Sequence, residues 1–286
     1  MAEPEERQSS NYGLGMVYNA DLLTELTELA TRLAKDAGAF LLAGVDRPRE
    51  QITTKSSGTD MVSEMDKGAE DLLVQGIRAA RPHDGILGEE GTSTEGSTAV
   101  KWVIDPLDGT TNYLYGNPQW SVSVGVEIDG MPVVGVVEAP TLRETFIATC
   151  GRGATRNDVA ITVSACSDPA MALVASGFGY ESTRRAWQGG VVANIAAHVR
   201  DIRRGGSAAL DLAYVACGRL DGYYETGLNP WDMSAGIVLV REAGGTVTDR
   251  AGTGEPTSAM CIAAGASIHA SLRSLLDSAH PSEPLI

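Results

Sequence analysis

Cysteine and histidine are scarce in this sequence, and their spacing suits neither cross-links nor a zinc site. The four cysteines lie far apart and form no CxxC pair, so we expect free thiols and neither a disulfide framework nor a zinc ribbon. The four histidines also lack the spacing of metal ligands, which disfavours zinc chemistry. These residues are Cys150, Cys166, Cys217 and Cys261, and His83, His198, His269 and His280.

Basic residues are outnumbered by acidic residues. The chain has 22 Lys and Arg against 37 Asp and Glu, which gives a net charge of −15 at pH 7. Because nucleic acid backbones are bound chiefly by Lys and Arg, we expect no nucleic acid partner. A protein this acidic can still bind a phosphate group, but it then needs metal ions or helix amides to do so.

Several other features are missing. No apolar run approaches the roughly 20 residues that a membrane-spanning helix needs, so no membrane partner is expected. Residues 1–18 are polar and acidic and lack the pattern of a secretion signal, which predicts a flexible tail on a cytoplasmic protein. There is no GxSxG elbow, which disfavours a serine hydrolase. There is also no P-loop.

The sequence does contain enough apolar residues for a large core. With 286 residues and 43% hydrophobic content, it predicts one large unit or two smaller cooperating ones. Apolar residues recur every three or four positions from Leu22 and predict a helix that ends near Gly44. Ser63 followed by Asp66 resembles a capping box, which predicts a second helix ending at about Arg81.

Strand patterns dominate the next stretch. Residues 120–128 alternate apolar with small or polar residues, and an Asp-Gly pair separates them from a second apolar run at 131–139, which predicts a hairpin. Two more strands are predicted at 143–149 and 160–163. We therefore expect helices over an antiparallel sheet in an N-terminal half, residues 19–167, that would bind metal.

The remaining residues, 168–286, alternate strand-like and helix-like segments and predict an α/β half that completes the active site. The predicted segments are 173–176, 191–199, 207–217, 221–225, 233–243 and 268–278.

The stretch VIDPLDGTT carries the first chemical signal. An apolar strand ends in Asp105 and Asp108; Pro106 is expected to block the strand and Gly109 to permit a tight turn. Thr110 or Thr111 would then cap a short helix whose free amides favour an anion. This arrangement would place cation ligands beside a phosphate site, although such a stretch is also compatible with an ordinary turn.

Two further acidic segments lie far away in the sequence. Glu89 and Glu90 follow a short apolar pair, and Asp232 opens a helix after Trp231. Each has a simpler interpretation, namely solvated charge for the first and a favourable helix-dipole contact for the second.

Taken together, DPLDGTTNY, GEE and WDMSAG resemble the inositol monophosphatase family of magnesium-dependent, lithium-sensitive phosphatases. The segments KSSGTDMVSEMD and RRGGSAALDLAYVACGRLDGYYE extend the resemblance over about residues 22–264. It implies a layered αβαβα sandwich, of mixed α+β and α/β class, like that of the inositol monophosphatases and fructose-1,6-bisphosphatases. A homodimer and inhibition by lithium are also implied.

The resemblance implies a magnesium site with two or three ions. Glu89, Asp105 and the carbonyl of Leu107 would hold one ion, and Asp105, Asp108 and Asp232 a second, with a weaker third ion near Glu89. Two cations about 3.5–4 Å apart stabilise both the attacking and the leaving oxygen of an in-line displacement.

Catalytic and substrate-binding roles follow from the same resemblance. Thr110, paired with Asp66, would orient and deprotonate the attacking water, with Glu89 as the third catalytic residue. The amides of Gly109 and Thr110 would face the phosphate. A polyol would be bound by the residues that match the family's substrate contacts: Asp108, Ser207, Ala208 and Glu225.

The resemblance leaves the substrate open. Inositol monophosphate or a similar polyol or sugar phosphate is favoured. Histidinol-phosphate phosphatases commonly carry Lys at the position of Thr111 and lack the YYE segment found here at 223–225. The alternatives are a related phosphatase for histidinol phosphate, fructose 1,6-bisphosphate, NADP or an adenosine bisphosphate, and a noncatalytic regulatory protein. The loop 176–190 is expected to border the substrate. Arg184 and Arg185 in this loop could contact a second anionic group or simply be solvated, and solvation is the favoured interpretation.

Overall fold

The computed structural model describes residues 18–45, 52–54 and 61–279, with no side chains described at 52–54 and 61–63. The tail predicted for residues 1–18 therefore lies almost entirely outside the described residues. So do the capping side chain predicted for Ser63 and the first part of the KSSGTDMVSEMD motif.

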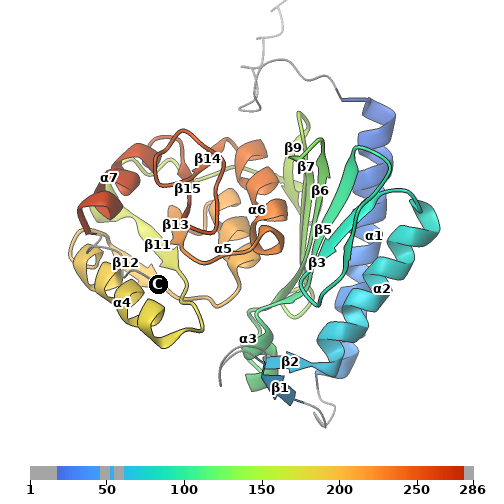
Figure 1. Ribbon diagram of the computed structural model, residues 1–286. Coiled ribbons are helices and arrows are strands. Elements are labelled where there is room, and N and C mark those ends of the chain that lie inside the picture. Colours follow the sequence, from blue (N-terminus) through green and yellow to red (C-terminus); the bar gives the residue numbers. More distant parts are fainter. Residues whose placement is uncertain (1–17, 46–51, 55–60, 280–286) are drawn as a thin grey trace, which may run out of the picture.

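Two long helices cover one face of the larger sheet (Figure 1). α1 spans Ala20–Gly44 and α2 spans Glu64–Ala80. The apolar residues that recur along α1, such as Leu26 and Leu33, are buried against the sheet and α2, while the polar residues between them face outward. Both helices predicted in this region are confirmed.

The larger sheet has eight strands in the order β10-β9-β8-β7-β6-β5-β3-β4, and all neighbours are antiparallel except β3 and β5. Their bounds are Gly85–Gly88 (β3), Ser93–Thr94 (β4), Val100–Asp108 (β5), Ser121–Ile128 (β6), Met131–Ala139 (β7), Glu144–Thr149 (β8), Gly153–Arg156 (β9) and Val159–Ile161 (β10). The hairpin predicted around the Asp-Gly pair is confirmed as β6 and β7. A separate two-stranded sheet pairs β1, Ile52–Thr54, with β2, Met61–Ser63.

The second sheet has five strands in the order β12-β11-β13-β15-β14, with β11 parallel to both of its neighbours. The strands are Leu173–Ser176 (β11), Asp201–Arg203 (β12), Gly222–Glu225 (β13), Gly245–Thr248 (β14) and Cys261–Gly265 (β15). The helices of this part are Ser182–Ile195 (α4), Ala208–Ala216 (α5), Pro230–Glu242 (α6) and His269–Ala279 (α7), and a short α3, Thr110–Tyr115, follows β5.

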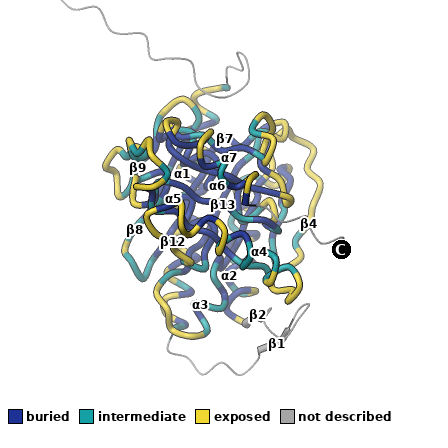
Figure 2. Tube along the Cα trace, turned by 90° about the vertical axis from the view of Figure 1, so that its left-hand side faces the viewer, coloured by how far each residue is buried: buried dark blue, intermediate teal, exposed yellow. Residues whose placement is uncertain are grey.

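These elements stack in five layers. α1 and α2 lie outside the larger sheet, α5 and α6 fill the space between the two sheets, and α4 and α7 cover the far side of the smaller sheet (Figure 1). Buried residues concentrate in the middle of the molecule, around α6 and β13 (Figure 2). The predicted αβαβα sandwich is confirmed.

The second half departs from its predicted segments in two respects. Residues 191–199 were predicted as one segment, but α4 starts nine residues earlier, at Ser182, and ends at Ile195. Three strands, β12, β14 and β15, were not predicted. β15, with the sequence CIAAG, is buried along its whole length, so it shows none of the alternation that identifies a half-exposed strand.

Two glycines allow α6 to lie very close to the larger sheet. A Cβ atom on Gly135 of β7 would lie 2.2 Å from the carbonyl oxygen of Ala235, and one on Gly125 of β6 would lie 2.3 Å from Oγ of Ser234. Any larger residue would therefore push the helix away. This close packing keeps the first turn of α6, which carries Asp232, near the end of β5.

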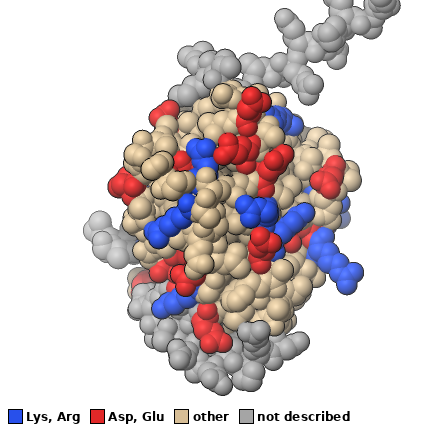
Figure 3. Space-filling view, turned by 90° about the vertical axis from the view of Figure 1, so that its right-hand side faces the viewer, with Lys and Arg blue, Asp and Glu red and all other residues tan. Residues whose placement is uncertain are grey.

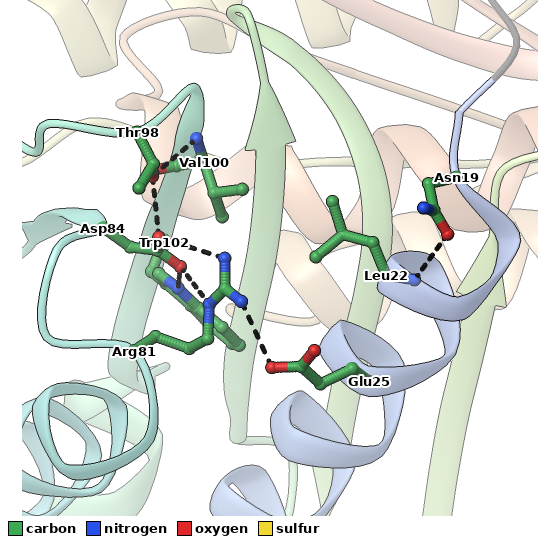
Figure 4. Close-up of polar contacts among 8 residues, drawn as sticks. All are labelled: Asn19, Leu22, Glu25, Arg81, Asp84, Thr98, Val100 and Trp102. Atoms are coloured by element: carbon green, nitrogen blue, oxygen red, sulfur yellow. Dashed lines mark hydrogen bonds and ion pairs between the residues drawn. The ribbon is translucent and has the colours of Figure 1, made fainter.

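Asp84 connects the end of α2 to β5 (Figure 4). Its buried carboxylate accepts hydrogen bonds from Arg81 Nε at 2.8 Å, Thr98 Oγ1 at 2.7 Å and Trp102 Nε1 at 3.1 Å. Burial raises the pKa of Asp84, but the hydrogen bonds from these three donors outweigh it, so the pKa lies below its ordinary value of 3.8. Arg81 also reaches Glu25 of α1 at 3.2 Å, which joins both helices to the sheet.

Replacing Asp84 with Asn is expected to lower the free energy of unfolding by about 3 kcal/mol, because Arg81 loses a buried charge partner and the amide cannot accept all of these bonds. Urea denaturation of this variant would measure the loss. Asp71→Asn, an exposed change on α2, is the matched control, with an expected change of less than about 0.5 kcal/mol. Equal stability of the two variants would contradict this role.

Candidate active site

Asp105 and Asp108 are brought to the same side of β5 by a β-bulge. Strand residues alternate between faces, so side chains three positions apart normally point in opposite directions. In β5, Asp105 lies opposite Ser123 and Asp108 lies opposite Ser121, so three steps along β5 match two along β6. The extra residue restores the alternation, and both carboxylates reach one site.

The expectation that Pro106 blocks the strand is wrong, since β5 continues to Asp108. A bulge accommodates proline because it leaves one residue outside the regular ladder of hydrogen bonds. Asp105 Oδ1 accepts the N–H of Leu107 at 2.9 Å, which fixes the carboxylate beside the bulge. Gly109 follows with φ of 95°, as expected for a glycine that makes a tight turn.

Glu89 reaches the site from the neighbouring strand. β3 runs parallel to β5 with Gly88 opposite Ile104, so the next residues, Glu89 and Asp105, lie side by side. The N–H of Glu89 donates to the carbonyl of Ile104 at 3.3 Å. The parallel register thus brings together two acidic residues that are 16 positions apart in the sequence.

The loop after β3 is held by Glu70 of α2, which is buried. Its carboxylate accepts the N–H of Glu90 at 2.8 Å, and the N–H and hydroxyl of Thr92 at 3.1 and 2.6 Å. A Cβ atom on Gly88 would lie 2.5 Å from Glu70 Oε2, so glycine leaves the room that this contact needs. Glu70 therefore positions the acidic loop, a role that the sequence did not reveal.

Asp232 comes from the other half of the chain, in the first turn of α6. Its Oδ2 accepts the N–H of Asn229 at 2.6 Å in a capping box. The carbonyl of Trp231 accepts a hydrogen bond from Ser123 of β6 at 3.2 Å, which ties the start of the helix to the larger sheet. The prediction that Asp232 lies at the start of a helix is confirmed.

The structure gathers six carboxylates into two groups, in each of which one oxygen per residue lies within 4.8 Å of the others. The first group contains Asp105, Asp108 and Asp232, and the second contains Asp66, Glu89 and Glu90. Glu90 was not among the predicted site residues. Glu89, predicted to share an ion with Asp105, falls in the second group but lies next to the first.

These carboxylates destabilise one another's charge. Burial raises the pKa of Asp105 well above 3.8, and repulsion from Glu89, Asp108, Asp232 and Asp66 raises it further. The pKa of Asp232 is raised well above its ordinary value by burial and then by Asp108. A bound cation would offset this repulsion, and carboxylate oxygens are the donors that Mg²⁺ and other hard divalent cations prefer. The donor set therefore fits a divalent metal site.

Thr110 connects the bulge to α2. Its hydroxyl lies 3.1 Å from Asp66 Oδ2 and 3.1 Å from the carbonyl of Leu107, and both can accept its proton. The expectation that Thr110 or Thr111 caps the following helix is wrong, because Gly109 is the N-cap of α3 and no side chain caps it. Thr110 directs its hydroxyl to the acidic residues, as the predicted pairing with Asp66 requires.

Asp108 joins the two halves of the site. Its Oδ2 accepts the Ser207 hydroxyl at 2.5 Å and the N–H of Ala209 at 2.7 Å, both at the start of α5. Burial raises the pKa of Asp108, although these hydrogen bonds oppose the rise. Glu225, at the end of β13, accepts a hydrogen bond from Tyr223 at 2.6 Å, and burial raises its pKa to about 7.

A cavity of about 380 Å³ opens above these groups. Every predicted site residue except Asp66 lines it: Glu89, Asp105, Leu107, Asp108, Gly109, Thr110, Ser207, Ala208, Glu225 and Asp232. Asp66 contacts the cavity wall through Thr110.

Other lining residues were not predicted or were interpreted differently. Residues 177–181 line the cavity, so the loop that includes them borders it as expected. Arg184, for which solvation was the favoured interpretation, also lines the cavity and is half-buried. Arg204 and Asp211 were missed, although both lie in the family-like segment that contains Ser207.

Comparison with known proteins identifies the family. The model of the inositol monophosphatase family matches residues 22–280. The chain belongs to this family. A relative from Pasteurella multocida named Nus factor SuhB is 41% identical over 229 residues, which cover 79% of this chain and 86% of the relative.

Solved structures agree with this family membership. The extragenic suppressor protein suhB from Bartonella henselae is 37% identical, with a TM-score of 0.83 over 88% of this chain and 98% of its own. An inositol monophosphatase from Anabaena is 36% identical, with a TM-score of 0.79 over 91% of this chain and 98% of its own. Members of this family act on phosphorylated substrates and depend on metal, which agrees with the acidic groups of the site. Among the described residues, no helix has both the length and the apolar character needed to cross a membrane.

Without metal, the protein is expected to become less stable as the pH rises from about 4 to about 7. The raised pKa values of Asp105, Asp108, Asp232 and Glu225 mean that the folded state binds more protons than the unfolded chain, and this advantage disappears as the groups ionise. His269 opposes the trend, because burial lowers its pKa from 6.5, but it is a single group.

Calorimetric melting temperatures in EDTA would measure this effect at pH 5.5 and 7.5, with saturating Mg²⁺ as the control. Metal should restore stability at the higher pH, because it replaces the lost protons as the source of positive charge. A metal-free protein that melts higher at pH 7.5 than at pH 5.5 would contradict this explanation.

Proposed function

We propose that this protein is a Mg²⁺-dependent phosphomonoesterase that hydrolyses inositol monophosphate or a similar polyol or sugar phosphate. The main support is the two groups of carboxylates, partly or wholly buried, that lie together at one cavity. Burial, and then repulsion from neighbouring carboxylates, raises the pKa of Asp105 well above its ordinary value. Such a concentration of negative charge is costly unless cations bind to it. Family membership supports a phosphorylated substrate.

We assign the metal ligands as the family resemblance implies. Glu89, Asp105 and the carbonyl of Leu107 would hold one Mg²⁺, and Asp105, Asp108 and Asp232 a second, with a third near Glu89. The grouping of Glu89 with Asp66 and Glu90 supports such a third site. Bound Mg²⁺ supplies charge stabilisation for the phosphoryl oxygens and lowers the pKa of coordinated water.

Thr110 and Asp66 are proposed to handle the attacking water. A threonine hydroxyl has one proton, and when that proton is donated to Asp66 the oxygen keeps its lone pairs as acceptors. The hydroxyl can then accept a hydrogen bond from water and pass a proton toward Asp66. Gly109 and Thr110 line the cavity, and their amides are proposed to donate to the phosphate.

The alcohol part of the substrate is proposed to lie against residues of the second half. Glu225 and Asp108 would accept hydrogen bonds from its hydroxyl groups, and Ser207 and Ala208 lie beside them in the cavity wall. Because burial raises the pKa of Glu225 to about 7, its ionised form, which accepts these bonds, predominates only above neutral pH. A homodimer, inhibition by lithium and a cytoplasmic location complete the proposal by family resemblance.

A panel of phosphomonoesters assayed with and without Mg²⁺ would test this function. We expect phosphate release from inositol 1-phosphate or a related polyol phosphate, complete dependence on metal, and inhibition by millimolar lithium. Fast release from histidinol phosphate or NADP, with slow release from polyol phosphates, would overturn the proposed substrate. The absence of release from every ester would overturn the enzyme assignment.

A second candidate is a regulatory protein on the same scaffold, since relatives carry the name Nus factor SuhB. Direct binding of nucleic acid is disfavoured by the net charge of −15. On the face over α1 and α2, acidic and basic side chains of the described residues are interspersed without a continuous basic patch (Figure 3). Tight binding of a macromolecule by a protein that releases no phosphate would favour this candidate.

A further inference from the structure

Arg184 extends over the wall of the substrate cavity from the first turn of α4. Two glycines make room for its side chain. A Cβ atom on Gly179 would lie 3.0 Å from Arg184 Cδ, and a Cβ atom on Gly227 would lie 2.4 Å from Arg184 Nη1. The guanidinium group is therefore seated between two backbone segments that both line the cavity.

This charge has no protein partner within the described ranges 18–45, 52–54 and 61–279, where the Arg184 side chain makes no hydrogen bond or ion pair. Glu181 is the nearest acid in the sequence, but its carboxylate caps α4 by accepting the N–H groups of Thr183 at 2.9 Å and Arg184 at 2.7 Å. The neighbouring Arg185 differs, because its guanidinium donates to the carbonyls of Gly179 and Tyr180 and so holds the loop.

Arg204, the other arginine in the cavity wall, already balances protein charge. Burial raises the pKa of both Glu225 and Asp211, and Arg204 opposes that rise in each of them. Arg204 therefore offsets the negative charge of Glu225 and Asp211 at the cavity. Arg184 remains as a half-buried cation that faces the space where the alcohol part of a substrate is proposed to bind.

We infer that the preferred substrate carries a second anionic group, a phosphate or a carboxylate, on its alcohol part, and that Arg184 is the specificity-determining residue that binds it. This inference rests on the proposed phosphatase function. A guanidinium offers paired N–H donors that match a phosphate or a carboxylate, and it gains most from an anion when it is partly removed from water. A neutral polyol monophosphate would leave this charge unmatched.

Three substrates with the same six-carbon chain would test the inference: glucitol 6-phosphate, glucitol 1,6-bisphosphate and gluconate 6-phosphate. They differ only at carbon 1, which is neutral in the first, carries a phosphate in the second and is a carboxylate in the third. We expect the wild-type protein with Mg²⁺ to show a kcat/KM at least about 10-fold higher for one or both anionic substrates than for glucitol 6-phosphate. The comparison between the two anionic substrates identifies the preferred group.

Arg184→Gln is expected to remove this preference by raising KM for the anionic substrates about 10-fold or more, with less than about a 3-fold change for glucitol 6-phosphate. Gly179→Ala keeps the charge but displaces the side chain, so it should weaken the preference by a smaller factor. Arg203→Gln is the matched control, because Arg203 is exposed and paired with Asp201 at 2.7 Å outside the cavity, and it should keep the preference.

The outcomes separate this inference from the proposed function. Phosphate release from glucitol 6-phosphate without any preference for an anionic carbon 1 would overturn the inference alone. An equal loss of activity on all three substrates in Arg184→Gln would do the same, since it would indicate a general structural role. If the wild-type protein released phosphate from none of these three substrates and none from inositol 1-phosphate, the proposed function itself would be overturned.

Discussion

Replacing Asp105 with Asn is expected to lower kcat/KM for a phosphomonoester by a factor on the order of 1,000 at saturating Mg²⁺. Asp105 is the most deeply buried carboxylate of the first acidic group, and it is proposed to be a ligand of two ions. An amide keeps the shape of the side chain but removes the charge that these ions share. Steady-state kinetics on the best ester from the phosphomonoester panel would measure the loss.

The same substitution should raise thermal stability in the absence of metal. The strongest influences on the pKa of Asp105, burial and four nearby carboxylates, all disfavour its charge, so a neutral side chain relieves repulsion in the folded state. The stabilisation by Mg²⁺ should shrink in parallel. Such opposite effects on activity and stability are typical of residues kept for function.

Asp211→Asn is the matched control for Asp105→Asn. Asp211 is also buried with a pKa raised by burial and by Glu225, but it lies outside both acidic groups. This variant should melt higher in EDTA and still be stabilised by Mg²⁺ as strongly as the wild type. Retention of more than about a tenth of the activity in Asp105→Asn would contradict its assignment as a shared ligand.

Replacing Thr110 with Val is expected to lower kcat by roughly 100-fold or more while metal affinity stays within a few-fold. Valine has nearly the same shape, so the change removes only the hydroxyl. This hydroxyl lies 3.1 Å from Asp66 and accepts a hydrogen bond from water in the proposed mechanism. Thr110→Ser keeps the hydroxyl and should retain most of the rate. Single-turnover phosphate release would isolate this chemical step.

Thr111→Val makes the same chemical change one residue further along α3 and serves as the control. The side chain of Thr111 does not cap the helix, so its loss should change kcat by less than about 3-fold. Equal effects at both positions would indicate a general disturbance of α3 and would remove Thr110 from the mechanism.

Sequence reasoning located the acidic residues but not the way in which they meet. The pattern DPLDGTT indicated a strand that ends in carboxylates, yet a regular strand would point Asp105 and Asp108 to opposite faces. The bulge that reconciles them depends on pairing with Ser121 and Ser123 of β6, and no local pattern encodes a partner's register.

Other parts of the site depend on contacts between distant segments. The pairing of Glu89 with Asp105 follows from a parallel register, and the anchoring of its loop by Glu70 follows from the packing of α2. The orientation of Arg184 depends on Gly179 and on Gly227, which lies 43 residues further along the chain. Periodicity identifies buried faces, but such long-range contacts require the folded structure.

The fold explains why the site lies between the halves of the chain. Asp108, at the end of the larger sheet, accepts hydrogen bonds from Ser207 and Ala209 at the start of α5, and α6 brings Asp232 to the same point. The proposed metal ligands from both halves thus meet at the helices that fill the middle layer. Ions bound here would strengthen the contact between the two sheets as well as supply the chemistry.

The carboxylates of the two acidic groups are proposed to bind divalent cations. Titration of the metal-free protein with Mn²⁺, a spectroscopic substitute for Mg²⁺, would count the bound ions directly from the electron paramagnetic resonance signal of free Mn²⁺. We expect at least two ions per chain in the wild type and fewer in Asp105→Asn. A wild-type protein that binds no Mn²⁺ at millimolar concentration, or an Asp105→Asn variant that binds as many ions as the wild type, would contradict the account.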